Sequence, residues 1–149
     1  MNIIFESKII QTAPMACKVG VGEKAVMLHS AGELESYLAG QQRNWQFRSL
    51  DIKSLQKAYE NSFFADHVLI AGVFASNSGS TKIKLRQVTL RNRNLDLLFS
   101  IDHPGIGLHN MMSWHYFVAV ASEQLPADVV VRTNLPLAKP RRGFETVTE

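Results

Sequence analysis

The fold is decided by residues 63–101, FFADHVLIAGVFASNSGSTKIKLRQVTLRNRNLDLLFSI. Residues 67–75 are almost wholly apolar, and the run is too short to cross a membrane, so it predicts a strand covered on both faces. Residues 76–80 are small and polar with one glycine, which predicts a turn. Residues 95–101 alternate between apolar and polar positions and predict another strand.

A further strand lies between these two, and its alternation changes phase in the middle. Ile83 and Leu85 share one face, but the next apolar residues are Val88 and Leu90, a shift of one residue. Because a slip of one residue would turn the apolar set outward, we expect a β-bulge at residues 86–88. The short turns between the three strands indicate an antiparallel meander.

The flanking segments predict more strands and two helices. The strands are expected at residues 2–10, 24–29, 114–121 and 128–132. Ser30 and Glu33 match a capping box, so a helix is expected from Ala31 to about Ala39, with Gly40 as its stop signal. Asp51 predicts the start of a second helix that ends near Asn61.

The expected fold class is therefore α+β and β-rich. It is an antiparallel sheet or sandwich of about seven strands, with two short helices before the central strands. The 149 residues, 46% apolar and 19% charged, are typical of one globular domain. We expect this domain at residues 1–132. Residues 133–149, with two prolines and a basic cluster, are expected to form an extended and mobile tail.

The single cysteine, Cys17, cannot form an internal disulfide, which fits a reducing compartment. Residues 15–17 superficially resemble a lipoprotein cleavage site. Glu6 and Lys8 interrupt any apolar segment before it, so no export signal is expected in the chain as written. The expected location is the cytoplasm, or the cell envelope if a signal peptide has been removed.

Four segments share their hydrophobic pattern with a known family. They are SAGEL at residues 30–34, FADHVLI at 64–70, SGS at 78–80, and WHYFVAV at 114–120 followed by Leu125-Pro126. Together they resemble the PrcB-type C-terminal domain, a small β-rich bacterial domain named for a subunit of a surface protease complex. The resemblance spans residues 24–131. It implies a sandwich-like domain that contacts another protein, with no catalytic residues to carry over.

Positive charge is concentrated in the central strands. Residues 67–95 contain no Asp or Glu, and they contain the basic residues Lys82, Lys84, Arg86, Arg91 and Arg93. One interpretation is a solvated strand face, or a sheet edge protected against aggregation. The other is a strip that binds an acidic protein surface, a polyanionic glycan or nucleic acid. Stacking aromatics are missing from the strip, which counts against nucleic acid.

No catalytic constellation is apparent. His103, His109 and His115, with two methionines nearby, suggest a soft-metal site, but their spacing matches no zinc pattern. Cys17 has no identifiable base, and residues 78–80 lack the pattern of a serine nucleophile. We therefore expect no metal, no cofactor and a non-catalytic binding or adaptor domain for another protein. The alternatives are anion or nucleic-acid binding through the basic hairpin, or a metal-dependent domain that uses the three histidines.

Overall fold

The structure, a computed structural model, describes residues 1–12, 22–45, 47–76, 81–102 and 112–135. Its elements are β1 (Phe5–Thr12), β2 (Gly22–Leu28), α1 (Ala31–Trp45), α2 (Ser49–Ala58), α3 (Asn61–Phe64), β3 (His67–Ser76), β4 (Lys82–Arg91), β5 (Asn94–Asp102), β6 (Met112–Ala121), the 3₁₀ turn η1 (Ser122–Gln124) and β7 (Val130–Thr133). The described residues thus form a β-rich α+β domain with seven strands in two sheets and three helices, which confirms the expected class.

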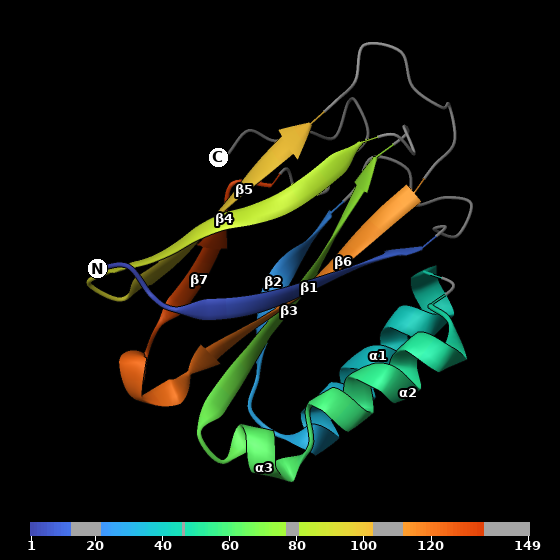
Figure 1. Cartoon of the computed structure of the whole chain (residues 1–149), viewed down its shortest axis with the longest axis horizontal. Coiled ribbons are helices and arrows are strands. Elements are labelled where there is room, and N and C mark those ends of the chain that lie inside the picture. The colour runs from blue at the N-terminus through green and yellow to red at the C-terminus, as the bar shows by residue number, and fades with distance from the viewer. Residues whose placement is uncertain (13–21, 46, 77–80, 103–111, 136–149) are drawn as a thin grey trace, which may run out of the picture.

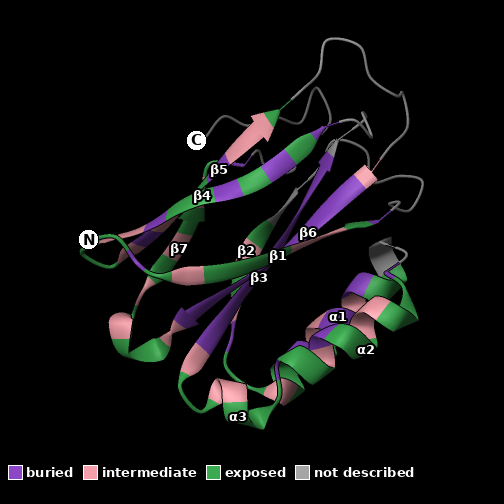
Figure 2. Ribbon diagram, in the orientation of Figure 1, coloured by how far each residue is buried: buried purple, intermediate pink, exposed green. Residues whose placement is uncertain are grey.

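The elements are stacked in three layers. The helices α1 and α2 cover one face of a four-stranded sheet, and a three-stranded sheet covers its other face (Figure 1). The order in the larger sheet is β1-β6-β3-β2, and all its pairings are antiparallel. Its central strands β3 and β6 are the most continuously buried (Figure 2). Their apolar residues on both faces are explained by this double cover.

The smaller sheet has the order β4-β5-β7. β4 and β5 pair in antiparallel fashion with a register shift between Leu85 and Gln87, so the predicted bulge is confirmed. Arg86 is the extra residue, and Leu85 and Val88 on either side of it are both buried in the same core. β7 departs from the expected antiparallel arrangement, because it pairs parallel to β5. Between β5 and β7 the chain passes through β6 and η1, and this long connection permits the two strands to pair in parallel.

The first residues of the chain connect the two sheets. Ile3 N–H donates to the Val88 carbonyl at 2.8 Å, and Leu90 N–H donates to the Met1 carbonyl at 2.9 Å. The segment therefore extends the outer edge of β4 before it continues as β1 beside β6. The Ile3 side chain is buried in the core between the sheets.

The first helix begins as predicted but ends later. The Glu33 amide donates to Ser30 Oγ at 3.1 Å, and the Glu33 carboxylate accepts from the His29 amide rather than that of Ser30. The expected stop at Gly40 was wrong, because α1 continues to Trp45. Leu34, Leu38 and Gln41 form one buried face across the glycine, and packing of this face outweighs the glycine's cost of about 1 kcal/mol.

The second helix also differs from its prediction. It begins at Ser49, with Arg48 in the capping position, and it ends at Ala58, before a separate helical turn at α3. Asp51 is therefore not its cap. Its carboxylate lies in the first turn and accepts from Arg48 Nε at 2.9 Å.

The described packing continues three residues past the expected boundary at residue 132. Leu135 is buried, and the Asn134 side chain donates to the Phe99 carbonyl and accepts from the Phe99 amide, both at 2.8 Å. The rest of the expected tail, residues 136–149, lies outside the described residues. In the part of the chain that the structure describes, no helix is long and apolar enough to cross a membrane.

Candidate functional site

The five basic residues predicted as a binding strip are all exposed. Lys82 and Lys84 point away from the core because they alternate with the buried residues Ile83 and Leu85. The strip begins at these lysines and runs along β4. Because Ile83 and Leu85 face the core between the sheets, the lysines lie on the other face of the smaller sheet. The larger sheet separates the smaller sheet from the helices (Figure 1). Arg91 lies at the far end of β4.

Their surroundings divide the five residues into two groups. Arg93 lies in the turn after Asn92, which has a φ of 58°, and its guanidinium forms an ion pair with Asp128 at 2.8 Å. It therefore contacts the segment before β7. Arg86, in the bulge, donates from Nε to Ser100 Oγ at 3.0 Å. Among the described residues, Lys82, Lys84, Arg86 and Arg91 form no ion pair within 4.0 Å.

An ion pair that the sequence did not predict also lies on this face. Asp96 of β5 and Arg132 of β7 are register partners, and two hydrogen bonds of 2.7 and 3.0 Å join them. The hydrogen bond from Arg132 lowers the pKa of Asp96, and the charge of Arg91 lowers it further. Only the parallel pairing of β5 with β7 brings these residues together, and no local pattern in the sequence indicates that pairing.

Two apolar side chains complete the face, which we call the β4–β5–β7 face. Leu98 and Val130 are each 48% exposed, although both are strand residues. A shallow depression of about 300 Å³ lies beside Leu98 and is bordered by the Asp96–Arg132 pair and Asn134. The face therefore combines unpaired cations, one fixed ion pair and exposed apolar groups.

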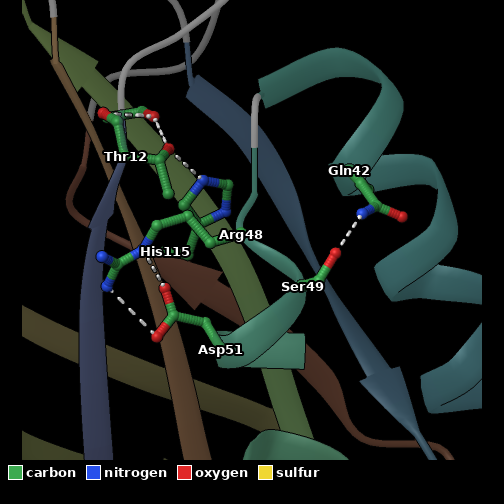
Figure 3. Close-up of polar contacts among 7 residues, drawn as sticks. Thr12, Gln42, Arg48, Ser49, Asp51 and His115 are labelled. Carbon is green, nitrogen blue, oxygen red and sulfur yellow. Dashed lines mark hydrogen bonds and ion pairs between the residues drawn. The ribbon is translucent and has the colours of Figure 1, made fainter. Parts of the chain in front are cut away.

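His115 is the one histidine of the possible metal set that lies in the described ranges. It lies on the face of the larger sheet that the helices cover. Its Nε2 lies 2.9 Å from Thr12 Oγ1, which is 2.6 Å from Ser113 Oγ, and Ser113 in turn donates to the Thr12 carbonyl (Figure 3). The chain of bonds is complete when Nε2–H donates to Thr12. Burial lowers the pKa of His115 to about 3, so the ring is neutral.

The segment between α1 and α2 closes over this histidine. The Phe47 ring meets the His115 ring edge-on, with centroids 4.6 Å apart. Gln42 Nε2 donates to Ser49 Oγ at 3.3 Å across this segment, and Arg48, the residue after Phe47, pairs with Asp51 (Figure 3). His115 is 0% exposed, and so is Ser113. The Thr12–Ser113–His115 cluster therefore joins β1 to β6 and cannot reach a substrate from solvent.

The remaining members of the possible metal set, His103 and His109, lie outside the described residues, as does Cys17. Within the described ranges, no group of three His, Cys, Asp or Glu side chains could hold a metal ion.

Comparison with protein-family models, curated proteins and solved structures found no match to this chain. The resemblance to the PrcB-type domain therefore stays a prediction. Function is inferred from the geometry of the chain itself, and the β4–β5–β7 face is the best-supported candidate site.

Proposed function

We propose that this chain is a non-catalytic binding module that contacts an acidic region of another protein through the β4–β5–β7 face. The observation that carries the proposal is that Lys82 and Lys84 are exposed and form no ion pair with a described residue, on the face that also exposes Leu98. Two residues apart on one strand, these lysines are separated by about 7 Å, which suits two carboxylates on an extended segment or a helix.

The mixed character of the face favours a protein over a polyanion. Asp96 and Asp102 lie among the cations, and Asp102 is directly opposite Lys82. A uniformly charged nucleic acid or glycan would be repelled by these carboxylates, whereas a protein surface can match both signs. The described strands of this face carry no outward aromatic residue for base stacking. An apolar centre at Leu98 with charges around it is the usual anatomy of a protein interface.

The chemistry of the face also favours binding over catalysis. Its best-held carboxylate, Asp96, has a lowered pKa and stays ionised, so it is a poor general acid near neutral pH. No histidine or cysteine lies in the described parts of β4, β5 or β7 to act as a base or nucleophile.

A photo-crosslinking experiment tests the proposal and captures the partner at the same time. A photoreactive residue replaces Leu98, and in a matched control it replaces Leu50, which is 73% exposed on α2. In cells of the source organism, we expect one dominant protein adduct from position 98 and none of that size from position 50. Adducts that come equally from both positions, or that consist of nucleic acid, would contradict the proposal.

Charge reversal makes the test specific. The double variant Lys82→Glu/Lys84→Glu is expected to reduce the position-98 adduct, and to weaken binding of the purified partner at least tenfold, roughly the effect of two unfavourable charge pairs. The double variant Lys53→Glu/Lys57→Glu changes two exposed lysines of α2 by the same net charge, and it is expected to bind normally. An equal loss of binding in both double variants would show that binding depends only on the net charge of the chain, and it would contradict the proposal.

A further inference from the structure

A pocket of about 530 Å³ lies on the helix-covered face of the larger sheet, beside the connection from α3 to β3. Its walls come from three segments that are far apart in the sequence: β1 with the residue before it, α3 with β3, and β6 with η1. α3 and η1 lie at the same end of the β3–β6 pair (Figure 1). The floor consists of Ala119 and Ala121 of β6, whose small side chains leave the space open.

One wall of this pocket is aromatic. The rings of Phe63 and His67 stack with their centroids 4.9 Å apart and an interplanar angle of 17°. His67 Nδ1 lies 2.6 Å from Asp66 Oδ1, which holds the imidazole in this orientation. The stacked pair presents a flat surface of the kind on which planar cations pack.

Apart from His67, the ionisable side chains that line the pocket are carboxylates. Glu6 of β1 and Glu123 of η1 line it, and neither carboxylate forms an ion pair within the described chain. No Lys or Arg is among the described residues that line it. The nearest cation along β1, Lys8, has its ammonium over the Tyr59 ring at 5.3 Å from the centroid and is not part of the lining.

A third acceptor is buried and has no partner. Gln124 Oε1 is inaccessible to solvent and accepts no hydrogen bond from any described residue. An unpartnered buried carbonyl oxygen costs free energy, but a donor in the pocket can reach this one only if the Gln124 side chain turns toward it. The pocket therefore offers two exposed carboxylates and an aromatic wall, and the donors among its described side chains are the His67 ring and the amide nitrogen of Gln124.

From this combination we propose that the pocket binds a guanidinium group carried on an alkyl chain. A guanidinium has five N–H donors in a plane, so it can serve both carboxylates while its face packs on the Phe63–His67 pair. The alkyl chain lies against the alanine floor. The group can belong to a small guanidino compound or to an arginine side chain of another protein, and the two sources are separated by experiment. This site is distinct from the β4–β5–β7 face and does not depend on its function.

The test uses the full ¹⁵N-labelled chain and two probes, n-propylguanidinium and a short blocked peptide with one central arginine. We expect amide shifts at His67, Ala121 and Glu123 at millimolar probe concentrations, and none with the same peptide when citrulline replaces arginine. The variants Glu6→Gln and Glu123→Gln are each expected to weaken binding roughly tenfold, as for the loss of one charge-assisted hydrogen bond. Glu35→Gln, an exposed carboxylate of α1, is the matched control and is expected to change nothing.

A gain-of-affinity variant keeps the test independent of folding defects. Ile4→Glu adds a carboxylate at a lining position that is 82% exposed, and it is expected to tighten binding. A peptide that binds about tenfold tighter than n-propylguanidinium assigns the site to an arginine of a protein, and equal affinities assign it to a small guanidino compound. The proposal is overturned if the citrulline peptide binds as well as the arginine peptide. It is equally overturned if Glu35→Gln weakens binding as much as Glu123→Gln does, or if no shifts appear at the pocket.

Discussion

Gly72 of β3 lies directly opposite Tyr116 of β6, and the Tyr116 ring fills the space that a side chain at residue 72 would need. A Cβ atom there would overlap Oη and Cζ of the tyrosine. The ring is 1% exposed and packs on Phe99 of the opposite sheet, with centroids 4.8 Å apart. Absence of a side chain at residue 72 therefore lets a tyrosine lie between the two sheets.

Substitution of Gly72 by Ala should destabilise the protein. Tyr116 must move against Phe99, and we expect overpacking to lower the free energy of unfolding by about 1–3 kcal/mol, measured by urea denaturation. Gly32→Ala is the control. A Cβ at residue 32 would have Ser30 Oγ as its nearest neighbour at 3.9 Å, so no loss is expected. A Gly72→Ala protein as stable as wild type would show that the tyrosine can move freely.

Stability should decrease as the pH is lowered, because of His115. Its pKa is about 3 in the folded chain and 6.5 in an exposed histidine, so below pH 6.5 the unfolded chain binds a proton that the folded chain does not. The stabilisation is complete above pH 6.5 and is lost as the pH falls toward 3, at about 1.4 kcal/mol per pH unit. Urea midpoints between pH 6.5 and about 5, above the main range of carboxylate titration, would measure it.

Two variants isolate the contribution of this histidine. His115→Gln keeps a hydrogen-bonding group near Thr12 but cannot titrate, so its stability should depend less on pH over that range. His29→Gln removes an exposed histidine and should keep the wild-type slope. The same slope in His115→Gln and wild type would exclude His115 as the titrating group.

Deletion of Arg86 should be tolerated, whereas deletion of Lys84 should not. Without Arg86, Leu85 and Gln87 become adjacent and keep their partners Phe99 and Leu98, so only the bulge is lost. Without Lys84, Leu85 takes an outward position and the register slips. We expect a folded protein with a loss of about 1–2 kcal/mol in the first case and unfolding in the second, measured by circular dichroism and thermal denaturation. Two equally unfolded proteins would contradict this view of the bulge.

Substitution of Asn134 by Ala should weaken the edge of the smaller sheet. Both bonds to Phe99 are lost, and an amide without a partner costs about 1–3 kcal/mol. Hydrogen exchange of the Phe99 amide should accelerate, while that of Leu69, between β2 and β6 in the other sheet, should change only as far as global stability does. Unchanged exchange at Phe99 would mean that another group takes over its bonds.

The sequence alone determined the features that depend on neighbouring residues. The phase change between Leu85 and Val88 located the bulge, and Ser30 with Glu33 located the start of α1, because strand alternation and helix capping act over a few residues. The exposure of Lys82 and Lys84 follows from the same alternation. The end of α1 was missed because burial of Leu38 and Gln41 against distant residues outweighed the local signal of Gly40.

Only the tertiary structure decided which distant segments meet. The Asp96–Arg132 pair needs the parallel alignment of β5 with β7, and the pocket lined by Glu6 and Glu123 needs three segments that are distant in the sequence. It also divided the basic residues, since Arg93 is engaged by Asp128, 35 positions along the chain, while Lys82 and Lys84 form no ion pair among the described residues. Strand pairing depends on the burial of whole sheet faces. The few residues that it brings together therefore carry no local sequence pattern that predicts their contact.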